Sequence, residues 1–344
     1  MSRDDESPSG NRQPFISEIR PPQAIINPLH TTPEKPHSSH LLEWEEKLKR
    51  YEESLRANPW QKRLQAIAHN KMLLTGMVLG LIVLGLAILG PVFYDADYAR
   101  QSLRNAHKPP LSDGYLLGTD NYGRDMAIRL FVGFRVSLWV AAAVTALSLL
   151  GGVILGMIGG YLGGVVDRMV RSSTDFIWGF PLILVAVLLV GGLGEGLFPV
   201  ILAVGIVNVA AITRVVRGEV VVLKEKEFVE AARAAGVSRY RIMWRHLLPN
   251  VLAPALIMAS YLIAVAVIAE AALSFIGLGA QPPLPSLGEM IADGRGFLRL
   301  NHWEATIPGI GIVVLVLAVS MIGDGLRDHF DPRLRHEKKK KSGE

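Results

Sequence analysis

The chain has 344 residues, half of them apolar, and a mean hydropathy of +0.31. The apolar residues gather in long blocks with almost no charge, which is typical of a polytopic membrane protein and excludes a single soluble globular domain. Because the chain contains no cysteine, disulfides, cysteine-ligated zinc and thiol catalysis are excluded. The formal net charge of +5 calls for no nucleic-acid partner, since an uneven distribution of lysine and arginine across a membrane explains it.

Three segments precede the first apolar block. Residues 1–40 are proline-rich and poor in bulky apolar side chains, so we expect a disordered cytoplasmic tail with no cleavable signal peptide and no metal site. Residues 41–57 repeat apolar residues at helical spacing and predict an amphipathic helix, whose narrow seam fits either a partner subunit or the membrane surface. Residues 58–71 predict an interfacial elbow helix, with Asn58 as its N-cap and Pro59 at its first position.

Six apolar blocks are long enough, or nearly so, to cross a bilayer as helices of about 20 residues. They lie at 72–94, 136–158, 176–195, 197–213, 251–272 and 305–326, within a predicted transmembrane domain of residues 72–335. The third and fourth blocks are separated only by a glycine-rich turn around Glu195. A basic cytoplasmic tail, residues 336–344, follows the domain, and its lysines fit anionic lipid headgroups.

The distribution of basic residues predicts the orientation of these spans. With a cytoplasmic N-terminus, the inner segments from residue 56 onward hold 21 lysines and arginines and the outer segments hold 8. The positive-inside rule therefore places both termini in the cytoplasm. The exception is the first outer loop, where Arg124, Arg129 and Arg135 crowd the second span.

The first outer loop also carries an apolar stripe at helical spacing. Gly118 and Gly123 bracket a turn, and the stripe follows at Met126, Leu130 and Phe134. One interpretation is an outer surface helix that steadies the second span. The other is a docking surface for an extracellular protein, with Asp120, Arg124 and Asp125 as its docking residues.

Two polar residues lie within otherwise apolar spans. A carboxylate facing hydrocarbon costs a few kcal/mol, so Glu270 should face protein, water or the outer interface. A role in a pore or gate and simple interfacial placement both fit Glu270. Asn208 fits either an interhelical hydrogen bond or a contact with a transported solute.

Between the fourth and fifth spans lies a basic, helix-prone segment, residues 226–250. It predicts a first helix over 226–235, a left-handed turn at Gly236, and a second helix that starts at Ser238 and ends near Leu247. Pro249 should prevent continuation in register. Two short cytoplasmic helices joined by a sharp turn can be a structured loop without a partner, or a projection that fits another protein's groove.

The order Glu230-Ala231-Ala232, then Gly236, then Leu248-Pro249 resembles the EAA loop of ABC importer permeases. In that family the loop forms the coupling helices that dock on ATP-hydrolysing subunits. His246 departs from the general pattern, which has isoleucine there, but residues 245–250 are similar to the form found in the peptide and nickel branch. The resemblance implies the following coupling residues: Glu230, Ala231, Ala232, Arg233, Gly236, Arg239, Leu248 and Pro249.

Other stretches resemble the C-type permeases of the dipeptide, oligopeptide and nickel family over about residues 60–335. They are residues 117–120 with 123–125, Asp175 with Phe180-Pro181, residues 274–279 with 281–283, and residues 323–328 with 331–333. The resemblance implies an all-α, type I ABC importer permease fold with six transmembrane helices in the bacterial inner membrane. Its implied partners are a B-type permease, an extracellular solute-binding protein and two ABC ATPases, which would hold the ATP and Mg²⁺. This chain itself would carry no cofactor.

The sequence lacks the motifs of an enzyme that would work alone. It contains no Gly-Lys dipeptide and hence no Walker A loop, no His-Glu-x-x-His helix and no Gly-x-Ser-x-Gly elbow. The expectation is therefore a transport subunit for dipeptides or oligopeptides, with nickel or glutathione as alternative cargo. A membrane-embedded enzyme and a signalling scaffold are alternatives of a different class, and binding of an ATPase to residues 228–248 would separate transport from both.

Overall fold

The computed structural model describes residues 70–94 and 96–330, and in this part of the chain the ordered elements are all helical. The predicted tail 1–40, the helix 41–57, nearly all of the elbow 58–71 and the tail 336–344 lie outside the described residues. The long helices are α3 (Lys71–Phe93), α4 (Met126–Leu162), α7 (Leu197–Leu223), α10 (Leu248–Phe275) and α12 (Trp303–Phe330). Each is long and apolar enough to cross a membrane.

The third predicted span, 176–195, is not one continuous helix. It is replaced by α5 (Gly164–Trp178) and α6 (Leu182–Leu193), which meet at an angle of 91°. The bend has a local cause, because Pro181 has no N–H to continue a helix and disfavours a helical conformation in the residue before it. Gly179 ends α5 by donating to the carbonyls of Asp175 and Phe176. Counted as one broken span, the pair brings the number of candidate spans to six in the described residues.

The second span begins earlier than predicted. The apolar stripe that begins at Met126 forms the first turns of α4, and its side chains, including Leu130, Phe131 and Phe134, are buried. The interpretation of this stripe as a separate surface helix is therefore wrong. Asp125 caps the helix, with Oδ1 accepting a hydrogen bond of 2.8 Å from the backbone N–H of Ala127.

Glycines on α4 allow close packing against α7. A Cβ placed on Gly152, Gly156 or Gly160 would come within 2.5–2.8 Å of side-chain atoms on α7. Small residues of this kind let membrane helices approach closely where lipid supplies little hydrophobic drive. The facing α7 residues, in the same order, are Ile212, Val216 and Val220.

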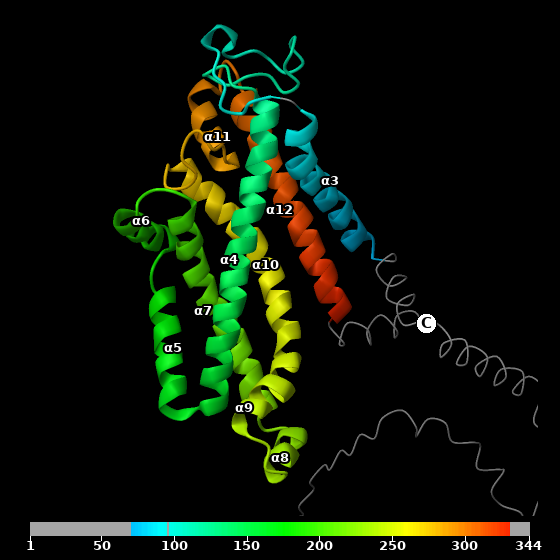
Figure 1. The fold of residues 1–344 in the computed structure, drawn as a ribbon, viewed down its shortest axis with the longest axis vertical. Coiled ribbons are helices and arrows are strands. Elements are labelled where there is room, and N and C mark those ends of the chain that lie inside the picture. The colour runs from blue at the N-terminus through cyan, green and yellow to red at the C-terminus, as the bar shows by residue number, and fades with distance from the viewer. Residues whose placement is uncertain (1–69, 95, 331–344) are drawn as a thin grey trace, which may run out of the picture. The chain divides into compact units, whose positions relative to one another are not determined.

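The elements that connect the spans gather at two opposite ends of the described region (Figure 1). At one end are α8 (Glu227–Ala234), α9 (Arg239–Arg241) and a π-helical turn, Ile242–Leu247, which leads into α10. At the other end are the loop 96–125, with its short 3₁₀ turn Leu103–Asn105, and α11 (Leu287–Gly294), which the 3₁₀ turn Arg295–Phe297 follows.

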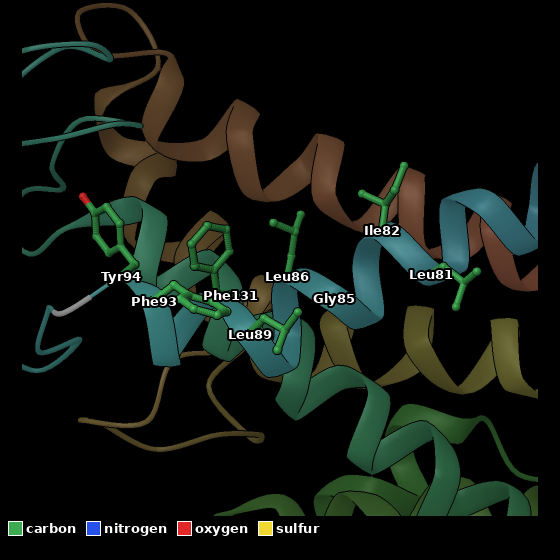
Figure 2. Close-up of a pocket in the computed structure, with 9 residues that line it drawn as sticks. Leu81, Ile82, Gly85, Leu86, Leu89, Phe93, Tyr94 and Phe131 are labelled. Atoms are coloured by element: carbon green, nitrogen blue, oxygen red, sulfur yellow. The ribbon is translucent and has the colours of Figure 1, made fainter.

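An apolar groove of about 420 Å³ runs along α3 (Figure 2). Its lining extends from Leu81 to Tyr94 on α3 and its C-cap and includes Phe131 of α4, and none of the lining residues is charged. Leu81 is 68% exposed. An exposed apolar face is what a lipid-embedded helix requires, so this groove is unsuited to a polar solute.

Candidate coupling site and polar clusters of the bundle

The predicted turn at Gly236 has the geometry of a Schellman motif. Gly236 takes a φ of +76°, its N–H donates to Arg233, and the N–H of Val237 donates to Ala232, both at 3.0 Å. These two bonds satisfy carbonyls at the end of α8 that would otherwise lack partners. Ser238 then caps α9, with its Oγ accepting from the N–H of Arg241 at 3.4 Å. The sharp turn therefore follows from local residue chemistry.

The helix pair is anchored by apolar side chains on one face only. Val229 of α8 and Ile242 and Leu247 of the π turn are fully buried against Val216 and Val220 of α7. The opposite face is exposed. The structure presents on it the predicted residues Glu230, Ala231, Arg233, Gly236 and Arg239.

The remaining predicted coupling residues differ from these. Ala232 and Leu248 are half-buried and pack on the apolar cluster. Pro249 is exposed, but it does not interrupt the helix, because Arg239–Phe275 forms one continuous helical span. The expectation that Pro249 separates the second coupling helix from the span is wrong. The π turn lies directly before it, and Pro249 occupies the first turn of α10, where proline is tolerated.

Polar contacts tie α8 and the end of α7 to the end of the α4–α5 hairpin. Lys224 Nζ, at the C-cap of α7, donates to the Gly160 carbonyl at 3.2 Å, and the guanidinium of Arg233 of α8 lies 5.7 Å from the Tyr161 ring centroid. Arg217 of α7 forms an ion pair and hydrogen bonds with Asp167 of α5. The α8–α9 pair is therefore connected to α4 and, through α7, to α5, as well as to α10.

The sequence predicted a basic segment here, but sequence reasoning missed the aromatic residues that share the surface of the second helix with its arginines. Arg241 and Arg245, one turn apart, and the neighbouring Tyr240 and Trp244 line a hollow of about 540 Å³. The first turn of α8 is acidic, with Glu227 and Glu230, so the segment changes sign along its length. The i, i+4 spacing of the two arginines was the signal available in the sequence.

Glu270 is completely buried and joins two spans. Ser137 of α4 donates to Oε2 at 2.8 Å, and Ser274 of α10 donates to Oε1 at 2.7 Å. Among the described residues, no lysine, arginine or histidine forms an ion pair with it. Asn208 is also buried, and its Nδ2 has no hydrogen-bond partner in the described part of the chain. In this conformation Glu270 faces protein and forms an interhelical contact.

The three residues considered for outer docking are turned inward. Asp120 accepts from Arg124 Nε at 2.6 Å, and Arg124 Nη2 reaches Asp293 of α11 at 2.7 Å. Arg129 extends this network to Glu289 at 3.4 Å. Asp120, Arg124 and Asp125 are each at most 8% exposed, so their side chains hold the loop 96–125 on the bundle and are not displayed to a docking protein.

Asp125 also links the end of α3 to the start of α4. Its Oδ2 accepts a hydrogen bond of 2.7 Å from the Tyr94 hydroxyl. Burial, together with this hydrogen bond and the negative charge of Asp125, raises the pKa of Tyr94 to about 12. The phenol therefore stays neutral at physiological pH.

Within the described residues, no group of three or more histidines and carboxylates is placed to hold a metal ion. The chemistry of the chain in these regions is that of packing, ion pairs and an exposed helix pair. This pattern suits a protein that moves against partners.

Comparison with known proteins identifies the family. A model of the binding-protein-dependent transport system inner membrane component matches residues 152–336, and a model of the N-terminal transmembrane domain of oligopeptide transport permease C matches residues 58–110. Among solved structures, the MetNI methionine ABC transporter in an inward-facing form is similar at 21% identity over 56% of this chain and 94% of that chain, with a TM-score of 0.45.

Three curated relatives are similar over most of their length. The dipeptide transport system permease protein DppC of Alkalihalophilus pseudofirmus is 37% identical, over 81% of this chain and 91% of its own. The oligopeptide transport system permease protein OppC of Bacillus subtilis is 36% identical, over 80% and 90%. The di/tripeptide transport system permease protein DppC of Pseudomonas aeruginosa is 35% identical, over 81% and 94%. The chain therefore belongs to the binding-protein-dependent inner membrane components of ABC transport systems, among the OppC/DppC-type peptide permeases.

Proposed function

We propose that this permease forms half of the translocation pathway of an ATP-driven importer for dipeptides and oligopeptides. The observation that carries the proposal is the 35–37% identity to permeases named for dipeptides, oligopeptides and di/tripeptides, over about four fifths of the chain. As a permease subunit of the inner membrane, the chain is not itself an ATPase.

The partners follow from the same proposal. A second, B-type permease completes the pathway, two ABC ATPases bind on the cytoplasmic side with ATP and Mg²⁺, and a solute-binding protein delivers the peptide from outside. Both termini of this chain lie in the cytoplasm, which the excess of basic residues in the segments assigned inside supports. This orientation puts α8 and α9 on the side of the ATPases.

The coupling mechanism uses the exposed face of the α8–α9 pair. Glu230, Ala231 and Gly236 lie on this face, where small residues allow another backbone to approach. Closure of the two ATPases on ATP moves the pair, and its buried anchors on α7 and in the π turn transmit that movement to the spans. Hydrolysis and release of the nucleotide reverse the movement, so the bundle alternates between outward-open and inward-open states.

Reconstitution with the partner subunits tests the proposal. Proteoliposomes that hold the complete complex should accumulate labelled dialanine only when ATP and the binding protein are both supplied. Unlabelled di- and tripeptides should compete with this uptake, and nickel ions and glutathione should not. Uptake of nickel in place of dialanine would contradict the proposed cargo, and uptake without any ATPase would contradict the proposed coupling.

A further inference from the structure

The break between α5 and α6 carries an exposed group of charged and aromatic side chains, which we call the break cluster. Arg214 of α7 forms an ion pair of 3.2 Å with Asp175 of α5, and its guanidinium lies 4.2 Å from the centroid of the Trp178 ring. Phe176 and Phe180 complete the cluster and meet edge to face, with 4.9 Å between ring centroids. Trp178 is tied to α7 through a hydrogen bond of 3.2 Å from Nε1 to the Val207 carbonyl.

The side chains of the break cluster are exposed in this chain. The side chain of Asp175 is 69% exposed and that of Arg214 is 46% exposed. Phe176 is 68% exposed and Trp178 is 50% exposed. The charged pair is therefore much more exposed than the Arg124–Asp293 and Arg217–Asp167 pairs, in which no side chain is more than 28% exposed.

The fourth span was expected to end at residue 213, but α7 continues to Leu223, so Arg214 lies within the helix and not in the following loop. It is nine residues before the end of α7 at Leu223, a distance of roughly 13 Å along the helix axis. The turns beyond it still pack on α4, where Val216 and Val220 meet Gly156 and Gly160. The cluster therefore lies alongside helices that still pack on one another, and it does not belong to a loop beyond the bundle.

Lipid is an unfavourable neighbour at this position. A charged side chain in hydrocarbon costs about 3 kcal/mol or more, and irregular backbone at membrane depth is tolerated only where protein or water covers it. Both features that lipid disfavours occur here at one site: irregular backbone at residues 179–181, and charged side chains in the Asp175–Arg214 pair. The α3 groove has neither a charge nor a break.

We propose that the break cluster lines the water-filled translocation pathway and binds the zwitterionic backbone of a short peptide in transit. This inference rests on the proposed function. Asp175 receives the terminal ammonium, Arg214 receives the terminal carboxylate, and Phe176 and Phe180 offer apolar surface to side chains of varied size. Recognition of the two termini, which all short peptides share, leaves the choice of side chain to other parts of the system.

The Asp175–Arg214 pair is suited to exchanging partners. Exposed ion pairs contribute only about 0–1 kcal/mol, so a zwitterion that supplies both opposite charges can replace the internal contact at little cost. The cation–π contact with Trp178 keeps the guanidinium in place while its carboxylate partner changes. Binding at such a site is weak, as release into the cell requires.

Cysteine labelling in the reconstituted complex tests this inference directly, since the chain contains no cysteine of its own. Phe176→Cys introduces a thiol beside Asp175. Leu81→Cys on α3 is the matched control, because both residues are 68% exposed in this chain. Ser172→Cys, one turn before Phe176 on the exposed face of α5, is a second reporter. Copurification with the partner subunits verifies that each variant assembles.

The probe is a charged, water-soluble methanethiosulfonate. We expect it to react with Phe176→Cys at least about tenfold faster than with Leu81→Cys, the equivalent of about 1.4 kcal/mol. Excess dialanine should slow the reaction. Acetylated dialanine, which has no ammonium group, should not slow it, and dialanine should lose its effect when Asp175→Asn is added.

Several results would overturn the inference. If both reporters on α5 react as slowly as Leu81→Cys, the cluster faces lipid or is covered by the second permease. If they react quickly but dialanine and acetylated dialanine have the same effect, the pathway is aqueous there but does not bind peptide termini. Uptake of dialanine by the complex without substitutions is measured in the same vesicles. Its absence contradicts the proposed function, whereas normal uptake with unreactive reporters contradicts only this inference.

Discussion

Arg135 compensates for a hydrogen bond that Pro91 cannot make. In an α-helix the carbonyl of Ala87 would accept from the N–H of residue 91, but proline has none. Arg135 Nε of α4 donates to this carbonyl at 3.1 Å. One of the arginines that crowds the second span thus has a structural role in joining α3 to α4, and Arg124 and Arg129 have theirs in the ion pairs with Asp293 and Glu289.

This pairing predicts an energetic coupling between two residues. Arg135→Met should lower the free energy of unfolding by about 1 kcal/mol, because the Ala87 carbonyl loses its donor. In a Pro91→Ala background, the restored N–H satisfies that carbonyl, so the same substitution should cost less. A double-mutant cycle on the thermal stability of the purified complex measures the difference. Equal costs in the two backgrounds would show that Arg135 acts elsewhere.

Glu270 offers a test of charge against hydrogen bonding. Glu270→Leu leaves the Ser137 and Ser274 hydroxyls buried without their acceptor, which should cost about 2 kcal/mol. Glu270→Gln can accept from one hydroxyl and donate to the other, so it should retain most of the stability and the uptake. Thermal unfolding and peptide uptake are measured for both, with Ser137→Ala as the control for loss of a single bond. If Gln is as damaging as Leu, the negative charge itself is required.

Among the elements, the α8–α9 pair depends on the backbone at Gly236. Its φ of +76° costs an L-residue about 1–2 kcal/mol. No atom lies within 4 Å of a Cβ built there, so the effect of a substitution comes from conformation and not from a clash.

Gly236→Leu should therefore leave membrane insertion intact but uncouple ATP hydrolysis from uptake, because α9 no longer follows α8 at the same angle. Gly236→Asn should retain more uptake, since asparagine adopts the left-handed conformation more readily. Both rates are measured in proteoliposomes, and complex assembly is checked for each variant. Normal coupling in Gly236→Leu would remove this turn from the mechanism.

The contact between Tyr94 and Asp125 joins two helix ends and predicts a pH dependence. The folded state raises the pKa of Tyr94 to about 12, above its ordinary value of about 10. Its contribution to stability is therefore complete below about pH 10 and is lost as the pH rises through about 12. Tyr94→Phe removes this dependence. The difference in melting temperature between the two proteins should shrink over that interval, and a constant difference would contradict the assignment.

The sequence predicted an element well when the residues that determine its structure are neighbours in the chain. The turn at Gly236 and the cap at Ser238 follow from residues next to each other in the chain, and both were predicted. The 91° break was missed although Gly179 and Pro181 mark it, because the average hydropathy of a block does not report the direction of the chain. The inward role of Arg124 could not be predicted, because its partner Asp293 is 169 residues away.

On the scale of the whole described region, the two ends are held by different forces. The end that holds the loop 96–125 depends on the buried network around Arg124 and Arg129, which connects this loop to α4 and α11. The opposite end depends on apolar anchors under α8 and the π turn. The ends should therefore respond independently to substitution.

Arg124→Gln tests this independence. Loss of one member of a buried ionic network should cost about 3 kcal/mol locally, so amide hydrogen exchange should accelerate in residues 96–125 and in α11. Exchange in α8 and α9 should not change. Arg100→Gln, an exposed position in the same loop, is the control for altered charge. Faster exchange at both ends would indicate one cooperative unit.

The close packing of α4 and α7 limits the relative motions that these two helices can make. The close contacts of Gly152, Gly156 and Gly160 with α7 leave the two helices little room to slide past one another. In the proposed transport cycle we therefore expect α4 and α7 to move as one rigid unit. We expect the bending that this cycle requires to occur at the break before Leu182 and at the π-helical turn before Leu248.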